Sequence, residues 1–110
     1  MNTTLKQLLA SDNVCFAEVI QHIDHLYAHT PTAFSNGAQQ NAATENQGSA
    51  KVFFYAHLHK LSEADTLAMF VEHYESVKNT PTGDNHQNIR QFMEHGWSGI
   101  HFQGVALQEK

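Results

Sequence analysis

Apolar residues recur every third or fourth position in several stretches of this chain, which is the spacing of an amphipathic helix. Residues 16–27 show this spacing and predict a helix that Asn13 caps. The helix is expected to end before Pro31, because the residue preceding a proline avoids helical geometry. A shorter pattern of leucines within residues 3–12 predicts another helix ahead of it. The beginning of the chain is therefore expected to be mainly helical.

Residues 51–61 carry apolar side chains on nearly every side. Such a segment is expected to be central and buried whether it forms a helix or a strand, and we favour the helix. Ser62 and the acidic residues that follow it resemble a capping box, which predicts the start of the next helix. That helix is expected to continue unbroken and to stop before Thr80.

A further helix is expected after the proline and glycine of residues 81–83. Asp84 or Asn85 is the predicted cap, and Gly96 suits a left-handed end of the helix. Trp97 is then expected to fold back onto the preceding turn.

Residues 100–107 alternate well enough for a strand, whose expected partner is residues 33–37 or another chain. Residues 38–49 are rich in Gln, Asn and Gly, and they fit either a mobile linker or an ordered loop hydrogen-bonded across the core. The predicted fold class is mainly α with a small β element (α+β). We expect a single domain over residues 1–110, with four to five helices and a short two-stranded sheet near the C-terminus.

The composition narrows the possible partners. The 110 residues carry a formal net charge of −5 and show no cluster of Lys and Arg, which argues against nucleic acid or an anionic membrane as a partner. A single cysteine, Cys15, excludes an internal disulfide and a multi-cysteine zinc site. We expect a cytoplasmic protein without a cofactor, whose partner is an unknown protein or a small polar or anionic ligand.

Nine histidines are a high share for a chain of this length. Three of them, His22, His25 and His29, follow Glu18 at spacings that place all four on one side of a helix. Imidazoles at this spacing can bind zinc, nickel or copper. Because the stripe lies opposite the apolar face, we favour a solvated surface over a metal site.

The most specific polar run is residues 84–90, at the start of the predicted helix. Asp84, His86, Asn88 and Arg90 would lie near free backbone N–H groups, which favours an anion site or an acid–base role for His86. A purely structural interpretation is also complete: Asp84 caps the helix, and Arg90 pairs with an acid such as Glu94. We favour the structural interpretation.

Ordered blocks along nearly the whole chain resemble the HopJ family, which is named for type III effectors that plant pathogens inject into host cells. The resemblance implies no established catalytic activity. Ala50 stands where the family commonly has a cysteine, which weakens any role for a cysteine nucleophile there. The blocks that carry the resemblance are residues 30–37, 45–51, 61–62 with 66–67, 86–93 and 96–107.

Three functions follow from the residues and the resemblance. The first is a non-catalytic binding or interaction module. The alternatives are a type III secreted effector that acts on a host protein, and a histidine-dependent metal-binding or acid–base enzyme. The effector alternative would place the protein in a host cell. The predicted ligand or partner surface comprises Asn46, Ser49, Asp84, His86, Asn88, Arg90 and Trp97.

Overall fold

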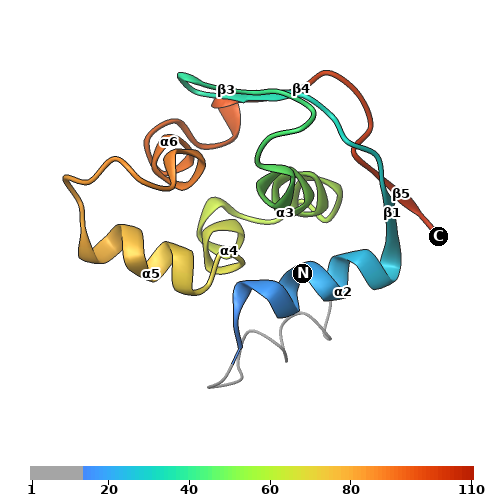
Figure 1. The fold of residues 1–110 in the computed structure, drawn as a ribbon, viewed down its shortest axis with the longest axis horizontal. Coiled ribbons are helices and arrows are strands. Elements are labelled where there is room, and N and C mark those ends of the chain that lie inside the picture. Colours follow the sequence, from blue (N-terminus) through green and yellow to red (C-terminus); the bar gives the residue numbers. More distant parts are fainter. Residues whose placement is uncertain (1–13) are drawn as a thin grey trace.

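Five α-helices and two small antiparallel sheets make up the part of the chain that the computed structural model describes, residues 14–110 (Figure 1). The helix expected within residues 3–12 lies outside the described residues. No helix in the described part is long and apolar enough to cross a membrane. The helices are α2 (Phe16–Leu26), α3 (Gln47–Leu58), α4 (Glu63–Ala68), α5 (Glu72–Asn79) and α6 (Gln87–His95), and a 3₁₀ turn, η1 (Gly96–Gly99), follows α6. The strands are β1 (Tyr27–His29), β2 (Phe34–Asn36), β3 (Gln39–Asn41), β4 (Ile100–Phe102) and β5 (Leu107–Glu109). The predicted α+β class is confirmed.

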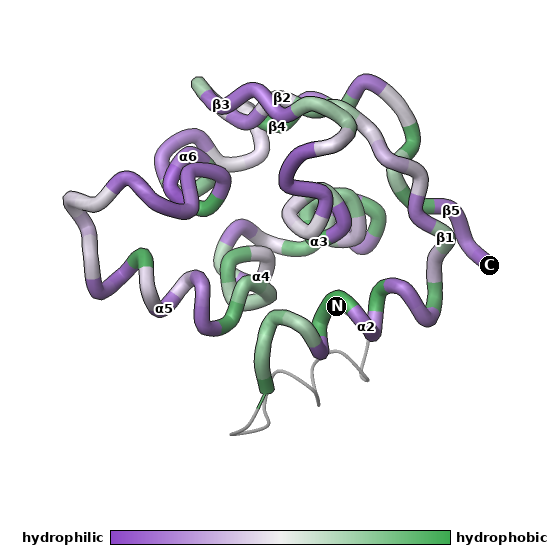
Figure 2. Tube along the Cα trace, viewed as in Figure 1, coloured by the Kyte–Doolittle hydropathy of each residue, from purple (hydrophilic) through white to green (hydrophobic). Residues whose placement is uncertain are grey.

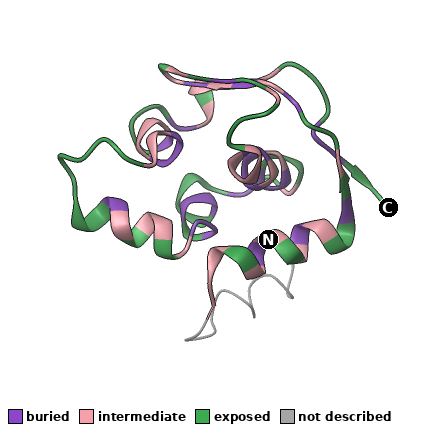
Figure 3. Ribbon diagram, viewed as in Figure 1, coloured by how far each residue is buried: buried purple, intermediate pink, exposed green. Residues whose placement is uncertain are grey.

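Helix α3 is the centre of the core, and the other helices and the sheets surround it (Figures 1 and 3). Its residues Val52, Phe53, Tyr55 and Ala56 are fully buried. The Phe53 ring lies 5.0–6.2 Å from the ring centroids of Phe34, Phe70 and Phe92, which come from β2, the α4–α5 junction and α6. The helix predicted for residues 51–61, and its burial, are confirmed.

The sheets bring together chain segments that are far apart in sequence. The order β3-β2-β4 places β2 between two antiparallel neighbours, with Phe34 opposite Phe102. The predicted partner of the last strand, residues 33–37, is therefore correct. The prediction of one strand over residues 100–107 is wrong. The pairing with β2 ends at Phe102, and a separate strand, β5, pairs with β1 to form a second sheet.

Helix α2 begins and ends differently from the prediction. Its N-cap residue is Cys15 rather than Asn13, and no side chain of the cap residue accepts a helix N–H. Instead, a carboxylate oxygen of Glu72 accepts the Phe16 N–H at 2.6 Å from across the fold. The helix ends at Leu26, because the next three residues leave it to pair with β5.

The helix predicted from Ser62 to the residues before Thr80 is broken in two. Its start is correct, since the Ser62 hydroxyl oxygen accepts the Asp65 N–H at 3.1 Å. Helix α4 ends at Ala68, and Val71, with φ of +50° and ψ of −112°, redirects the chain into α5. This break orients Phe70 so that its ring stacks on Phe16 at 5.7 Å.

Candidate functional site

A pocket of about 320 Å³ lies where the first turns of α3 and α6 meet. Asn46, Gly48 and Ser49 line it from the α3 side, and His86 and Asn88 line it from the α6 side. Four of the seven predicted surface residues are thus brought together in one pocket: Asn46, Ser49, His86 and Asn88.

The first turns of both helices face the pocket, and neither has a side-chain N-cap. The cap residues Asn46 and His86 share a left-handed conformation with φ of 52°, and neither side chain accepts a helix N–H. Neither first turn carries an acidic residue. Gly48 lies so close to the Phe16 ring that an added Cβ would come within 3.3 Å of it. Backbone N–H groups at these two helix ends therefore have no local acceptor and give the pocket a positive potential.

The predicted cap of α6, Asp84 or Asn85, is wrong, because the N-cap residue is His86. The Asp84 carbonyl oxygen accepts a hydrogen bond from the Gln87 side chain at 2.7 Å. The Asn85 side-chain oxygen accepts from the Arg90 guanidinium at 2.6 Å. These contacts fix the loop before α6, and His86 takes the N-cap position of the helix.

Asn46 and Asn88, which line the pocket, belong to a network of side-chain amides that continues into the core. The Asn41 side-chain oxygen accepts from Asn46 Nδ2 at 2.8 Å and from Asn88 Nδ2 at 3.0 Å. The Asn88 side-chain oxygen accepts in turn from Asn41 Nδ2 at 3.2 Å and from Asn36 Nδ2 at 3.1 Å. Asn36, Asn41 and Asn88 are each less than a tenth exposed. The network shows that residues 38–49 are an ordered segment, and the linker alternative is wrong.

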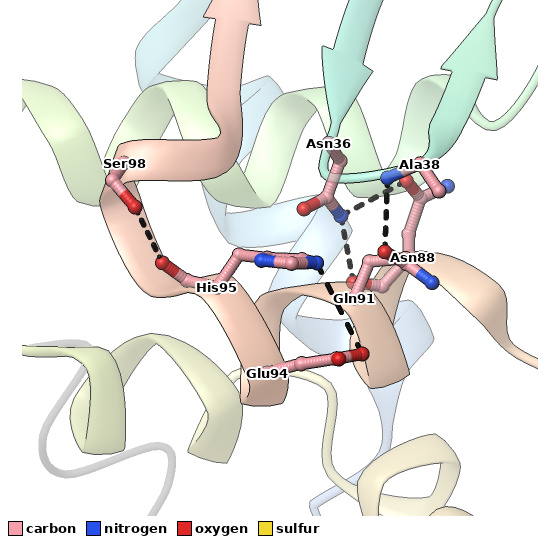
Figure 4. A network of polar contacts seen from close by, with 7 residues as sticks. All are labelled: Asn36, Ala38, Asn88, Gln91, Glu94, His95 and Ser98. Atoms are coloured by element: carbon pink, nitrogen blue, oxygen red, sulfur yellow. Dashed lines mark hydrogen bonds and ion pairs between the residues drawn. The ribbon is translucent and has the colours of Figure 1, made fainter.

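Figure 4 shows how α6 is joined to the β2–β3 hairpin beside this network. Asn36 points its amide nitrogen at Asn88, and the Gln91 side-chain oxygen accepts the Ala38 N–H at 2.9 Å. Figure 2 shows that β3 and most of α6 consist of hydrophilic residues. The start of α6 is therefore fixed relative to the strands by amide hydrogen bonds rather than by apolar packing alone.

Two imidazoles lie side by side at the pocket. The ring centroids of His73 and His86 are 4.8 Å apart, and His73 also meets the Phe16 ring edge-on at 4.9 Å. Burial lowers the pKa of His86 below its ordinary 6.5, and His73 and Arg90 lower it further. His86 is therefore a neutral imidazole at neutral pH. Sequence reasoning missed His73, since α5 reaches the pocket only through the tertiary fold and no local pattern marks it.

Arg90 belongs to the loop before α6 rather than to the pocket. Its guanidinium donates to the Thr80 carbonyl at 2.8 Å, and its Nε donates to the Asn85 carbonyl at 2.6 Å. The predicted pairing with Glu94 is wrong, because these loop acceptors already occupy the guanidinium. Asp84 does not line the pocket either.

Trp97 lies outside the pocket, on a different part of the surface. Gly96 ends α6 with φ of +62°, as predicted, and the Trp97 ring then packs edge-on against Phe92 with 5.0 Å between centroids. The indole N–H donates to the Leu61 carbonyl at 3.2 Å. The predicted single surface is therefore too large, because Trp97, Asp84 and Arg90 serve other contacts.

The candidate metal ligands His22, His25 and His29 do not form one set. His29 is on β1, where its Nε2 lies 3.1 Å from the Gln47 side-chain oxygen. His22 is half-buried on α2, and burial, followed by His25 and His59, lowers its pKa below 6.5. Within residues 14–110, no group of three or more His, Cys, Asp or Glu side chains is placed to hold a metal ion.

Comparisons with known proteins find a family and a solved structure that are similar to this chain. The family model of the HopJ type III effector protein matches residues 1–107. The crystal structure of the unknown-function protein VPA0580 is similar, with 41% sequence identity and a TM-score of 0.90. The match covers 100% of this chain and 95% of that chain. No curated protein matches the sequence.

Proposed function

This chain belongs to the HopJ family, and we propose that it is a non-catalytic binding module that holds a small polar or anionic ligand between α3 and α6. One observation carries the proposal: two helix N-termini without a side-chain cap meet at a single pocket, where an amide network holds Asn46 and Asn88 of the lining. Hydrogen-bond donors aimed at one cavity are what an oxygen-rich ligand requires.

The lining favours a particular ligand chemistry. The first-turn N–H groups, the Ser49 hydroxyl and the His86 imidazole supply donors, and no carboxylate of the described residues lines the pocket. The Phe16 and Phe70 rings supply an apolar wall beside these donors. A volume of about 320 Å³ is at the lower end of small-molecule sites, so the ligand is a small organic acid or phosphate ester.

A binding role is favoured over acid–base catalysis by the surroundings of the imidazoles. Histidine bases in enzymes are commonly oriented by a hydrogen-bonded carboxylate, which also stabilises the imidazolium. The neighbours of His86 are instead His73 and Arg90, which oppose its protonation. His86 is therefore suited to donating or accepting hydrogen bonds as a neutral ring.

The test is an ¹⁵N–¹H NMR titration with inorganic phosphate and with acetate as separate probes. Saturable shifts are expected at the amides of Gly48, Ser49 and Gln87, the first-turn residues of the two helices. Ser49→Glu places a carboxylate in the pocket and should abolish the shifts. Ser98→Glu is the matched control, because Ser98 is exposed on η1 and does not line the pocket. Shifts that persist in Ser49→Glu, or that are absent from the wild type, would refute the proposal.

The family description favours a second candidate function, that of a type III effector delivered to a host cell. A translocation assay with a fused adenylate cyclase reporter tests it, comparing a secretion-competent strain with a secretion-deficient one. Accumulation of cyclic AMP in host cells with the competent strain only would support delivery. Equal signals from the two strains would refute it.

A further inference from the structure

A second hollow, of about 450 Å³, shares no lining residue with the first pocket. Phe54, Ile100 and Phe102 form its apolar lining, and the rings of Phe54 and Phe102 meet edge-on at 5.1 Å. A neighbouring hollow of about 290 Å³ shares His57 and Trp97 with it. The two hollows thus form one aromatic groove that runs from α3 past η1 to β4.

Trp97 divides the groove and is held rigidly. Its indole N–H is bound to the Leu61 carbonyl, and its ring is fixed against Phe92. The ring is nevertheless only half-buried and lines both hollows. Rigid, partly exposed aromatic side chains of this kind are enriched at protein interaction sites, because they bury apolar area at little entropic cost.

The groove lies along a free strand edge. Strand β4 is the outer member of the order β3-β2-β4. The Gln103 N–H and the Gly99 carbonyl bond to the β2 side, so the ladder alternation turns the N–H and carbonyl groups of Ile100 and Phe102 away from β2. The Ile100 N–H bonds to the Trp97 carbonyl. Among the described residues nothing bonds to the Phe102 N–H, which is therefore available to an added strand.

The charged side chain that lines the groove is a cation. Lys60 lines the smaller hollow, and no Asp or Glu of residues 14–110 lines either hollow. Lys51 and Lys78 are paired with carboxylates at 2.8 Å, whereas Lys60 forms no ion pair within residues 14–110. In a chain of net charge −5, an unpaired cation beside an aromatic groove favours an acidic occupant.

We propose that this groove binds an extended acidic segment of a partner protein, which adds to β4 as a fourth strand of its sheet. The Phe102 N–H and the outward carbonyls pair with the backbone of the segment. An aromatic or aliphatic side chain fills the hollow between Phe54 and Phe102, and a carboxylate meets Lys60.

The test uses the only tryptophan of the chain, Trp97, as the reporter. The probe is the capped peptide acetyl-Glu-Val-Phe-Val-Glu-amide. The comparison peptides are its Lys-for-Glu counterpart and a version with N-methylated backbone amides, which cannot pair with a strand. The acidic peptide should give a saturable change in fluorescence, with NMR shifts at the amides of residues 100–102, and the lysine peptide should bind more weakly. The N-methylated peptide should bind at least fivefold more weakly.

Reversing the charge of Lys60 distinguishes this proposal from nonspecific binding of the peptide's aromatic side chain to the groove. Lys60→Glu should weaken the acidic peptide at least fivefold and strengthen the lysine peptide. The matched control Lys110→Glu changes the net charge equally, lies outside both hollows, and should leave both affinities unchanged. No saturable change up to roughly 1 mM peptide would overturn the proposal. Equal binding of the acidic and lysine peptides would also overturn it. Sedimentation that shows a dimer unable to bind the peptide would overturn it as well, because the groove would then be occupied by a second copy of this chain.

Discussion

Replacing Asn88 with alanine tests whether the buried amide network holds the pocket together. Its side chain donates one hydrogen bond to Asn41 and accepts one each from Asn41 and Asn36. A buried hydrogen bond contributes about 0.5–1.5 kcal/mol net, and an orphaned buried donor adds to the loss. The Asn36 and Asn41 amides each keep a second acceptor, the Asn88 backbone carbonyl and the Phe34 carbonyl. We therefore expect Asn88→Ala to lower the free energy of unfolding by about 2–4 kcal/mol.

The measurement is urea unfolding followed by Trp97 fluorescence and by circular dichroism, with an unchanged m-value as the check on two-state behaviour. Asn41→Ala and the double variant complete a mutant cycle, in which a coupling energy of about 1–2 kcal/mol is expected for a reciprocal amide pair. Gln40→Ala is the matched control, because this exposed amide is the neighbour of Asn41 on β3 and should change stability by no more than about 0.5 kcal/mol. A loss at Asn88 no larger than that of Gln40, or strictly additive losses in the cycle, would refute the reasoning.

Three further outcomes are expected. Trp97→Ala should cost about 2–4 kcal/mol, since it removes a half-buried ring packed on the core, and unfolding followed by circular dichroism measures it. Gly96→Ala should cost about 1–3 kcal/mol by the same measurement, because its φ is +62° and a Cβ would collide with the Glu63 carboxylate; no loss would show that the turn relaxes freely. Because burial lowers the folded-state pKa of His22 below 6.5, the unfolded chain binds the proton more readily, so stability should fall as pH drops below about 6.5 and level off below the lowered pKa. Thermal melts between about pH 7 and pH 5 measure this loss, which His22→Gln should reduce; an unchanged pH profile in that variant would contradict the assignment.

The sequence was sufficient to predict the elements whose burial or pairing follows from their own residues. An apolar segment with no polar face, residues 51–61, has to lie in the interior, and the structure makes it the central helix. The strand that begins at Ile100 needs a partner for its backbone groups, and residues 33–37 were the other segment predicted to be extended. Gly96 has no Cβ, so it predicted where α6 ends.

Features set by contacts across the fold could not be predicted in this way. A positive φ at a β-branched residue such as Val71 is unfavourable locally, so the pattern predicted one continuous helix. Glu72, which caps α2 from another helix, gives no local signal of that role. Arg90 and His73 show the same limit at the site. Arg90 binds loop carbonyls whose positions cannot be predicted from the sequence. His73 reaches His86 only because the fold places α5 beside the start of α6.

The pairing of β1 with β5 has a consequence for the order of folding. His29 lies opposite Leu107, so this ladder closes a loop of nearly 80 residues and fixes the exit of α2. Because closing so long a loop costs more conformational entropy than a local contact does, we expect the second sheet to form later than the helices and the β2–β3 hairpin.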